Sequence, residues 1–442
     1  MSSRRQFLKR CCALGSAGVT AHLTRLGLIT ANAQSNSTYQ AMVCIFLFGG
    51  NDSNNMIVPI GNYAAYAGVR GPLALGQGTL LPVNTKAGVA YGLHPRLVNV
   101  QKLYSQNKAA MIFNVGTLVR PTTKQQYQQG SVALPRNLYS HSDQQSQWQT
   151  SNPTVSGGTG WAGRVNDIVA PVTPFPAGVS VAGNSALLNG VSAGGVSISP
   201  GSNFGLDSFG SQAASDARFT ALQQILTFDT GVQMISASEG VMNNALKSAQ
   251  EIASALKSGT PLTTVFPNTG LGQQLKQVAE VMQVRSALGM NRQIFFASMG
   301  GYDNHSDLLQ SQDPLLNELD GAIGAFQAAL GELGVEQNVV TFTESEFNRT
   351  GGVSGTNGSD HAWGGHHFVI GGAVKGGDGY GTFPTMQLTG PDDVSNRGVW
   401  LPSQSLDQYA ATMASWFGVP DAMLTSAFPN LGNFTVKKLG FL

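Results

Sequence analysis

The stretch AMVCIFLFGGND, residues 41–52, decides the fold, because an unbroken apolar run ends in two glycines and two polar residues. Such a run is typical of a strand that is buried on both faces, as in a parallel sheet covered by helices. Similar stretches occur at 109–116, 292–305, 338–347 and 367–372, with helical patterns at 97–106 and 313–333. This alternation predicts an α/β fold with a largely parallel sheet flanked by helices.

The first 33 residues have the features of an export signal rather than of a helix that stays in the mature chain. SRRQFLK (3–9) is a twin-arginine signature, an apolar stretch follows, and ANA (31–33) is a small-x-small cleavage site. Arg25 interrupts the apolar stretch, and no span of about 20 apolar residues follows, so we expect no stable membrane anchor. The sequence therefore predicts a periplasmic or secreted protein with a single mature domain over 34–442.

Removal of this signal would change both the charge and the cysteine count. It would leave 20 Lys and Arg against 24 Asp and Glu, and no basic patch favours nucleic acid as a partner. Cys11 and Cys12 would also be removed, so Cys44 would remain alone and a disulfide framework is excluded. The twin-arginine route often serves proteins that acquire a metal before export, which favours a metal site.

The middle of the chain, about 187–290, is predicted to be an insertion or lid within this domain. Residues 187–212 are rich in Gly and Ser and poor in charge, and helical patterns follow at about 214–260 and 271–288. A flexible surface loop without a role is an equally good interpretation of the Gly/Ser-rich part.

Asp, Glu, Lys and Arg make up only 11% of the chain, yet ionisable residues gather in polar motifs that follow the predicted strands. Ligands bind at the carboxyl ends of strands in open α/β sheets, so we expect these motifs to form one site. Asp52 in GGND is a candidate metal ligand, with an Asx-turn or helix N-cap as the alternative. Asp303 and His305 are two residues apart, so in extended backbone they point the same way and could bind a divalent metal.

Two later motifs add further candidates. Glu344 and Glu346 would repel one another unless a cation or Arg349 neutralises them, and the alternative is a solvated pair at an exposed edge. His361 follows in SDHAWGGHHF, where at most one of the adjacent histidines at 366–367 is expected to join the site, because neighbours on a strand face opposite sides.

The motif SHSDQQ supplies a candidate nucleophile. A hydroxyl beside an imidazole and a carboxylate is an arrangement that can activate Ser142, with His141 as its base. The same residues could instead cap a helix that begins there.

The ordered motifs GGND, SHSDQQ, GWAGR (160–164), YDNHSDLL, TFTESEFNR and GSDHAWGGHH resemble a bacterial family that carries export signals, domain of unknown function fifteen-oh-one. That family is grouped with the alkaline phosphatase and sulfatase superfamily, so the resemblance implies an alkaline-phosphatase-like fold over the mature chain. It also implies metal ligands at Asp52, Asp303, His305 and His361, and a nucleophile nearest to Ser142. Glu-Ser-Glu at 344–346 stands where the superfamily usually has Asp-His, and Cys-x-Pro-x-Arg is absent. One metal with more oxygen ligands, or a degenerate site, therefore fits as well as a two-zinc phosphatase.

These features predict an exported hydrolase that uses a divalent metal (Zn, Mn, Fe, Mg or Ca) to cleave phosphate- or sulfate-type esters of a small molecule or glycan. Arg349 would neutralise charge on the transferred group. The full set of candidate metal ligands is Asp52, Asp303, His305, Glu344, Glu346 and His361. One alternative is a non-catalytic envelope protein that keeps the fold and binds a carbohydrate or protein partner. A metal-free serine esterase is a further alternative, without a G-x-S-x-G motif to favour it.

Overall fold

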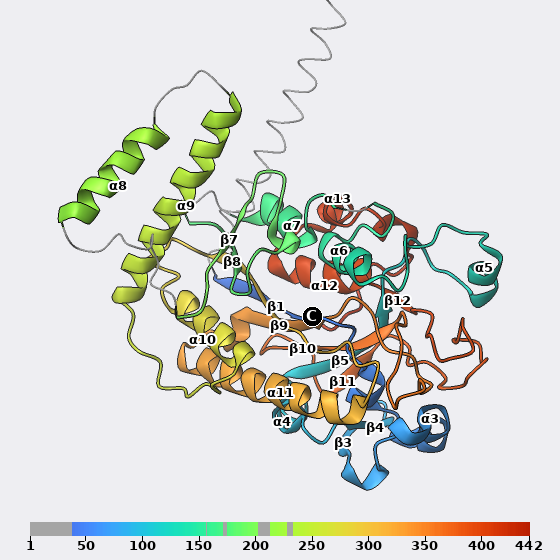
Figure 1. Ribbon diagram of the computed structural model, residues 1–442. Helices are drawn as coiled ribbons and strands as arrows, with labels where there is room; N and C mark the ends of the chain where they lie inside the picture. Colours follow the sequence, from blue (N-terminus) through green and yellow to red (C-terminus); the bar gives the residue numbers. More distant parts are fainter. Residues whose placement is uncertain (1–37, 156, 171–174, 202–212, 228–232) are drawn as a thin grey trace, which may run out of the picture.

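A nine-stranded sheet forms the centre of the molecule (Figure 1). The computed structural model describes residues 38–442 except 156, 171–174, 202–212 and 228–232, so the predicted export signal lies outside the described residues. The strand order is β11-β5-β10-β9-β1-β8-β6-β7, and β12 pairs with β5. The strands are β1 (Gln40–Leu47), β5 (Ala109–Gly116), β6 (Gly178–Ser180), β7 (Gly195–Ser197), β8 (Arg292–Met299), β9 (Val339–Glu344), β10 (Gly365–Ile370), β11 (Asp378–Tyr380) and β12 (Gln404–Ser405).

The sheet is largely parallel, as the sequence predicts. β1 lies between β8 and β9 and is parallel to both, with Cys44 opposite Phe296 on one side and Phe342 on the other. β10 runs antiparallel to both of its neighbours, β9 and β5. The carboxyl ends of β1, β8 and β9 therefore meet at one edge of the sheet.

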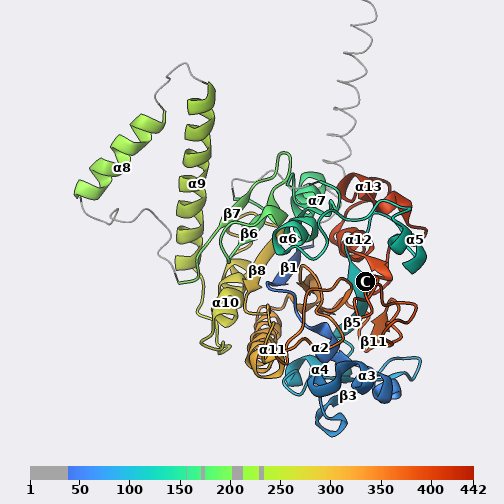
Figure 2. The same ribbon diagram turned by 45° about the vertical axis from the view of Figure 1, so that its right-hand side comes forward.

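Helices cover both faces of this sheet (Figures 1 and 2). Val43 and Ile45 of β1 belong to the core shared with the helices of one face, and Cys44 and Phe46 to the core of the other. The first face carries α4 (Val98–Ser105), α10 (Gly270–Gln283) and α11 (Leu308–Glu332), and the second carries α6 (His141–Thr150), α7 (Trp161–Val169), α12 (Leu406–Phe417) and α13 (Leu424–Ala427). The alternation of side chains along β1 thus supplies both cores.

Smaller elements surround these layers. A three-stranded antiparallel sheet has the order β2-β4-β3. Its strands and the neighbouring short helices are β2 (Ile57–Val58), β3 (Leu81–Asn84), β4 (Ala90–Leu93), α2 (Ser53–Met56), α3 (Tyr63–Arg70) and α5 (Lys124–Gln129). The part of the chain that the structure describes also forms the 3-10 turns η1 (Ile60–Asn62), η2 (Gly71–Leu73), η3 (Gln77–Thr79), η4 (Ala186–Leu188), η5 (Glu336–Asn338), η6 (Asp421–Met423) and η7 (Leu431–Asn433).

The range 187–290 contains two kinds of structure. The helices α8 (Ala213–Leu226) and α9 (Gln233–Lys257) form a hairpin that projects from the body of the molecule (Figures 1 and 2). In contrast, β7 extends the main sheet beside β6, and α10 buries Leu275 and Val278 in the core. Part of the range predicted to be an insertion or lid therefore belongs to the sheet and its cover. Among the described helices, none is both long and apolar enough to cross a membrane.

Candidate metal centre

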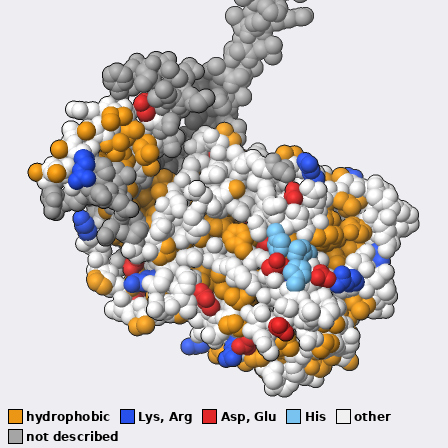
Figure 3. Space-filling view, in the orientation of Figure 1, with side chains coloured by type: hydrophobic (Ala, Val, Ile, Leu, Met, Phe, Trp, Pro, Cys, Tyr) orange, Lys and Arg blue, Asp and Glu red, His pale blue; other side chains and the backbone are white. Residues whose placement is uncertain are grey.

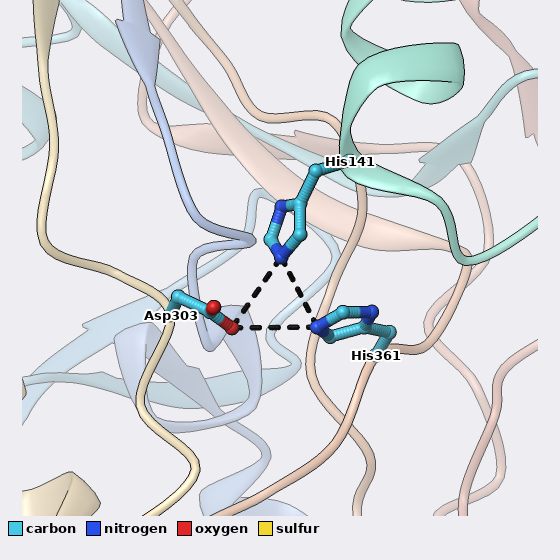
Figure 4. A group of neighbouring side chains, drawn as sticks. All are labelled: His141, Asp303 and His361. Carbon is cyan, nitrogen blue, oxygen red and sulfur yellow. Dashed lines mark hydrogen bonds and ion pairs between the residues drawn. The ribbon is translucent and has the colours of Figure 1, made fainter.

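Three side-chain atoms converge at the carboxyl edge of the sheet (Figure 4). The Nε2 atom of His141 lies 3.1 Å from Nε2 of His361 and 3.4 Å from Oδ1 of Asp303, and the last two atoms are 3.3 Å apart. Bonds of about 2.0–2.1 Å to a tetrahedral zinc ion place neighbouring ligand atoms roughly 3.3 Å apart. The three atoms therefore have the separations expected of ligands on one face of such an ion.

Three distant segments bring these side chains together. Ser140 caps α6 by accepting a hydrogen bond from the amide of Asp143, so the helix begins at His141 and directs this ring from its first turn. Asp303 follows β8, and His361 lies between β9 and β10. The backbone of Gly49, just after β1, approaches so closely that a Cβ there would lie 2.4 Å from the amide nitrogen of Asp303. Glycine is therefore required where β1 passes the Asp303 segment.

The other ring nitrogen of each histidine fixes its tautomer. Nδ1 of His361 lies 2.7 Å from the carbonyl oxygen of Tyr139, which can only accept, so this nitrogen carries the proton. Nδ1 of His141 donates in the same way to Oε1 of Glu346 at 2.8 Å. In the neutral rings both Nε2 atoms are therefore unprotonated, and their lone pairs face each other and the Asp303 carboxylate. A cation bound between these three acceptors would offset their mutual repulsion. Histidines that bind metals usually donate their other ring N–H to a carboxylate or a backbone carbonyl, as both histidines do here.

Glu346 is fully buried behind His141. Its carboxylate accepts hydrogen bonds from the amide of Gly49 and from Nε2 of Gln145, both at 2.9 Å. Burial by itself would raise the pKa of Glu346, but the hydrogen bonds from His141, Gln145 and Gly49 outweigh it and hold the pKa below its usual value. The hydrogen bond to Glu346 in turn raises the pKa of His141, whereas burial lowers that of His361.

Arg349 holds Asp303 in place. The buried guanidinium donates to Oδ1 of Asp303 at 2.7 Å, to the carbonyl of Gly49 at 3.2 Å, and to the carbonyl and hydroxyl of Ser359. Partial burial would raise the pKa of Asp303, but Arg349 outweighs this effect and lowers it. The prediction that Arg349 neutralises a transferred group needs correction, because its donors are occupied within the protein and it acts through Asp303.

His305 completes a second triangle of donors that shares the Asp303–His361 edge. Its Nε2 atom lies 2.9 Å from Oδ1 of Asp303 and 3.0 Å from Nε2 of His361. Its Nδ1 atom lies 3.1 Å from Oδ1 of Asp360, which also pairs with Arg397. His305 is thus oriented by a carboxylate in the same manner as His141.

Asp52 lies away from these histidines. It is buried, pairs with Arg70 of α3, and caps α2 by accepting from the amide of Asn54. Asp52 thus acts as a helix N-cap, which is the alternative interpretation of the GGND motif. Its charge is already compensated by Arg70, so its contacts do not favour a role as a metal ligand.

Glu344 is also separate from the three donors. It is fully buried at the end of β9, where Sγ of Cys44 lies 3.7 Å from Oε2. Burial raises the pKa of Glu344 to about 8, so the side chain is largely protonated at neutral pH and is a poor metal ligand. Neither Glu344 nor Glu346 is solvated, and they occupy two different environments.

Ser142, His366 and His367 are not directed at the three donors. Ser142 is exposed, and its hydroxyl lies 3.4 Å from that of Ser140 rather than against the imidazole of His141. Nδ1 of His366 accepts from the amide of Asn114, and His367 packs against Trp148. The predicted Ser142–His141 pair is therefore not formed, because both nitrogens of His141 contact other groups.

Three residues that support the site are not among those predicted from the sequence. Tyr139 acts through its backbone carbonyl, which no side-chain pattern reveals. Asp360 precedes His361 in the SDH motif but was not expected to orient His305. Arg397 lies in SNRGVW, outside the polar motifs that follow the predicted strands.

Comparison with known proteins gives a family but no function. Residues 39–399 match the family described as "Protein of unknown function (DUF1501)". No protein among the curated sequences matches the chain.

Solved structures with some similarity include a sulfatase and an alkaline phosphatase. The PsFucS1 sulfatase from Pseudoalteromonas sp. is 10% identical, with a TM-score of 0.32, and the match covers 90% of this chain and 76% of that one. The protein Ps i-CgsB in complex with k-i-k-neocarrahexaose is 9% identical, with a TM-score of 0.34 and coverage of 89% and 77%. The TAB5 alkaline phosphatase mutant with Mg bound is 10% identical, with a TM-score of 0.29 and coverage of 76% and 91%. Because these TM-scores are below 0.5, no activity is carried over from these proteins.

Proposed function

This chain belongs to the DUF1501 family of proteins of unknown function, and we propose that it is a metal-dependent hydrolase of phosphate- or sulfate-type esters. The observation that supports the proposal most directly is the triangle of His141, Asp303 and His361, whose facing atoms are all acceptors when the rings are neutral. The ester class follows from the resemblance of the ordered motifs to the alkaline phosphatase and sulfatase superfamily.

Two imidazoles and one carboxylate suit a transition metal better than Mg²⁺ or Ca²⁺, which prefer oxygen ligands. We therefore favour Zn, Mn or Fe over Mg and Ca. Three protein ligands with an open position are typical of catalytic rather than structural zinc sites. When bound, such an ion supplies a Lewis acid and lowers the pKa of water.

The residues of the chain have separate tasks in this proposal. Tyr139 and Glu346 hold the rings of His361 and His141 in the tautomer that presents Nε2. Arg349 holds the Asp303 carboxylate. In the reaction, water adds to the phosphorus or sulfur atom, the ester bond to the alcohol oxygen breaks, and the alcohol leaves with a proton from water.

The test is ester cleavage by metal-reconstituted protein. Aryl phosphates and aryl sulfates should be cleaved by the wild type, and Asp303→Asn should lose this activity together with the metal. Asp313→Asn is the matched control, because Asp313 is also a partly exposed carboxylate paired with an arginine, Arg96. Metal-replete wild type that cleaves neither ester class would exclude the proposal and favour a non-catalytic envelope protein.

Ser142 is tested in the same assay. Because its hydroxyl does not contact His141, we expect Ser142→Ala to keep the activity of the wild type. A loss of activity with normal metal content would restore Ser142 as the nucleophile.

We also propose export to the periplasm or the exterior through the twin-arginine route, on the basis of SRRQFLK and the cleavage site ANA.

A further inference from the structure

Arg397 lies at the rim of the histidine triangle and remains open to solvent. Its guanidinium pairs with Asp360, which in turn contacts Nδ1 of His305, and 53% of the arginine side chain is exposed. Figure 3 shows the pale-blue histidines on the surface of this face, with acidic and basic side chains beside them. A positively charged group is therefore available next to the site and not only within it.

The backbone that carries Arg397 is held firmly. The carbonyl of Arg397 accepts from the amide of Gly352, and the carbonyl of Gly398 accepts from the amide of Gly351. Oδ1 of the buried Asp393 accepts from the amides of Ser395 and Val399. The turn on both sides of Arg397 is thus fixed, so the side chain projects from a rigid base.

The guanidinium of Arg397 has N–H groups that are not used within the described protein, unlike that of Arg349. Arg349 is fully buried and uses its donors on Asp303, Gly49 and Ser359. An arginine has five N–H donors, and the contact that the described part of the chain gives the guanidinium of Arg397 is the one with Asp360. The remaining donors face solvent, in the planar arrangement that recognises phosphate, sulfate or carboxylate groups.

The charge balance of the site favours an anionic ligand. Three carboxylates take part in the contacts around the triangle (Asp303, Glu346 and Asp360), against two guanidinium groups (Arg349 and Arg397). A divalent cation in the triangle would leave one net positive charge. An anionic ligand could reach this positive charge at the exposed Arg397, but not at the buried Arg349.

We propose that Arg397 is the specificity-determining residue that docks a second negatively charged group of the substrate. This inference rests on the proposed function, because it assigns the docked group to the ester substrate. Asp360 and the ring of His305 separate Arg397 from the triangle, so the docked anion lies beyond the reacting ester. The substrate is therefore an extended molecule with more than one anionic group, such as a multiply sulfated or phosphorylated glycan, rather than a single small ester.

The experiment measures binding by calorimetry with two probes of equal length, a dextran sulfate oligosaccharide and an uncharged dextran oligosaccharide. We expect Arg397→Gln to weaken binding of the sulfated probe by roughly 10- to 100-fold, the usual cost of losing a hydrogen-bonded charged partner. Arg397→Lys should retain part of the affinity, because it keeps the charge but not the planar donors. The affinity of the wild type should also fall as salt increases, and that of Arg397→Gln should fall less.

Arg96→Gln is the matched control, because Arg96 is 51% exposed and pairs with Asp313 in the same way, outside the site. Equal losses in Arg96→Gln and Arg397→Gln, or no loss in Arg397→Gln, would overturn the inference. A wild type that binds the sulfated probe through Arg397 but cleaves no ester would refute the proposed function alone. An active enzyme whose Arg397→Gln variant binds and cleaves multiply charged esters normally would refute this inference alone.

Discussion

Nδ1 of His361 donates a hydrogen bond of 2.7 Å to the backbone carbonyl of Tyr139. This contact fixes the tautomer of the neutral ring, so Nε2 is unprotonated and its lone pair faces Asp303. Tyr139 has a φ of 73°, in the left-handed region that tyrosine rarely adopts. Such a conformation persists only where the surroundings enforce it, and here the amide of Tyr139 also donates to Oε1 of Gln144 at 2.6 Å. The backbone is thus held in an unfavourable conformation at a residue that orients a candidate ligand.

Metal binding should stabilise the folded protein. A ligand that binds only the folded state at 100 times its Kd adds about 2.7 kcal/mol to the free energy of unfolding. We expect Zn²⁺, Mn²⁺ or Fe²⁺ to raise the Tm of chelator-treated wild type and to leave Asp303→Asn unchanged, measured by calorimetry with elemental analysis. Stoichiometric iron with oxygen consumption and no ester cleavage would instead indicate an oxygenase, because two histidines and one carboxylate also bind Fe(II) in that class.

Glu346→Gln should weaken metal binding without removing a ligand. The amide cannot offer His141 the same charged acceptor, and loss of such a support typically costs about 10–100-fold in metal affinity. Glu344→Gln is the control, because Glu344 is equally buried and two residues away but contacts Cys44 instead. Titration with a competing metal chelator measures both variants, and equal affinities for the two would contradict the assignment of Glu346.

Asp52→Asn should destabilise the protein and leave its metal affinity unchanged. The substitution removes the negative partner of Arg70, whose side chain is fully buried, and breaking a buried ion pair typically costs about 3–5 kcal/mol. The exposed Arg96–Asp313 pair is the control, for which Asp313→Asn should lower the free energy of unfolding much less, because solvent screens an exposed pair. Urea denaturation and metal titration give the two quantities, and a large drop in metal affinity would return Asp52 to the set of ligands.

Glu344 should make the stability of the protein depend on pH. Burial raises the pKa of Glu344 from 4.5 to about 8, so between these values the folded state keeps a proton that the unfolded state has released. The free energy of unfolding therefore falls as pH rises through this window, by at most about 1.4 kcal/mol per pH unit from this group. Urea denaturation at pH 5 and pH 8 should show a smaller fall for Glu344→Gln than for the wild type. Equal falls would show that Glu344 keeps an ordinary pKa.

Export should depend on the paired arginines near the N-terminus. Replacing Arg4 and Arg5 by lysine removes the pair that defines the signature, so we expect uncleaved precursor to accumulate inside the cell. Immunoblots of cell fractions measure this. Unchanged export of the double variant would point to a different route.

The strands were the most predictable part of the molecule. β5 spans Ala109–Gly116, the range that its apolar run predicts, because a strand buried along its whole length leaves a continuous apolar signal. α11 begins at Leu308, five residues before the predicted start, and contains Pro314. Proline is typical of the first turn of a helix, so Pro314 favoured a start at 313, but the helix begins at Leu308 and continues through this proline.

The site was predictable only in part. Asp303, His305 and His361 meet, as their positions after strands suggest. Glu344 and Glu346 separate because Glu344 is still within β9, whereas the chain has left the strand at Glu346 and the two-residue alternation no longer applies. The pairing of Asp52 with Arg70 depends on how α3 packs, which no local pattern of residues encodes.

The distance along the chain between the two candidate ligand histidines has a practical consequence. His141 and His361 are 220 positions apart, and each ring is held by a residue near the other histidine: Glu346 holds His141, and Tyr139 holds His361. The complete site therefore forms only after both segments have been synthesised and packed, and uptake of the proposed metal would follow the assembly of the sheet. Bound metal per polypeptide would then count correctly folded molecules in a preparation, which makes it a measure of sample quality independent of any substrate.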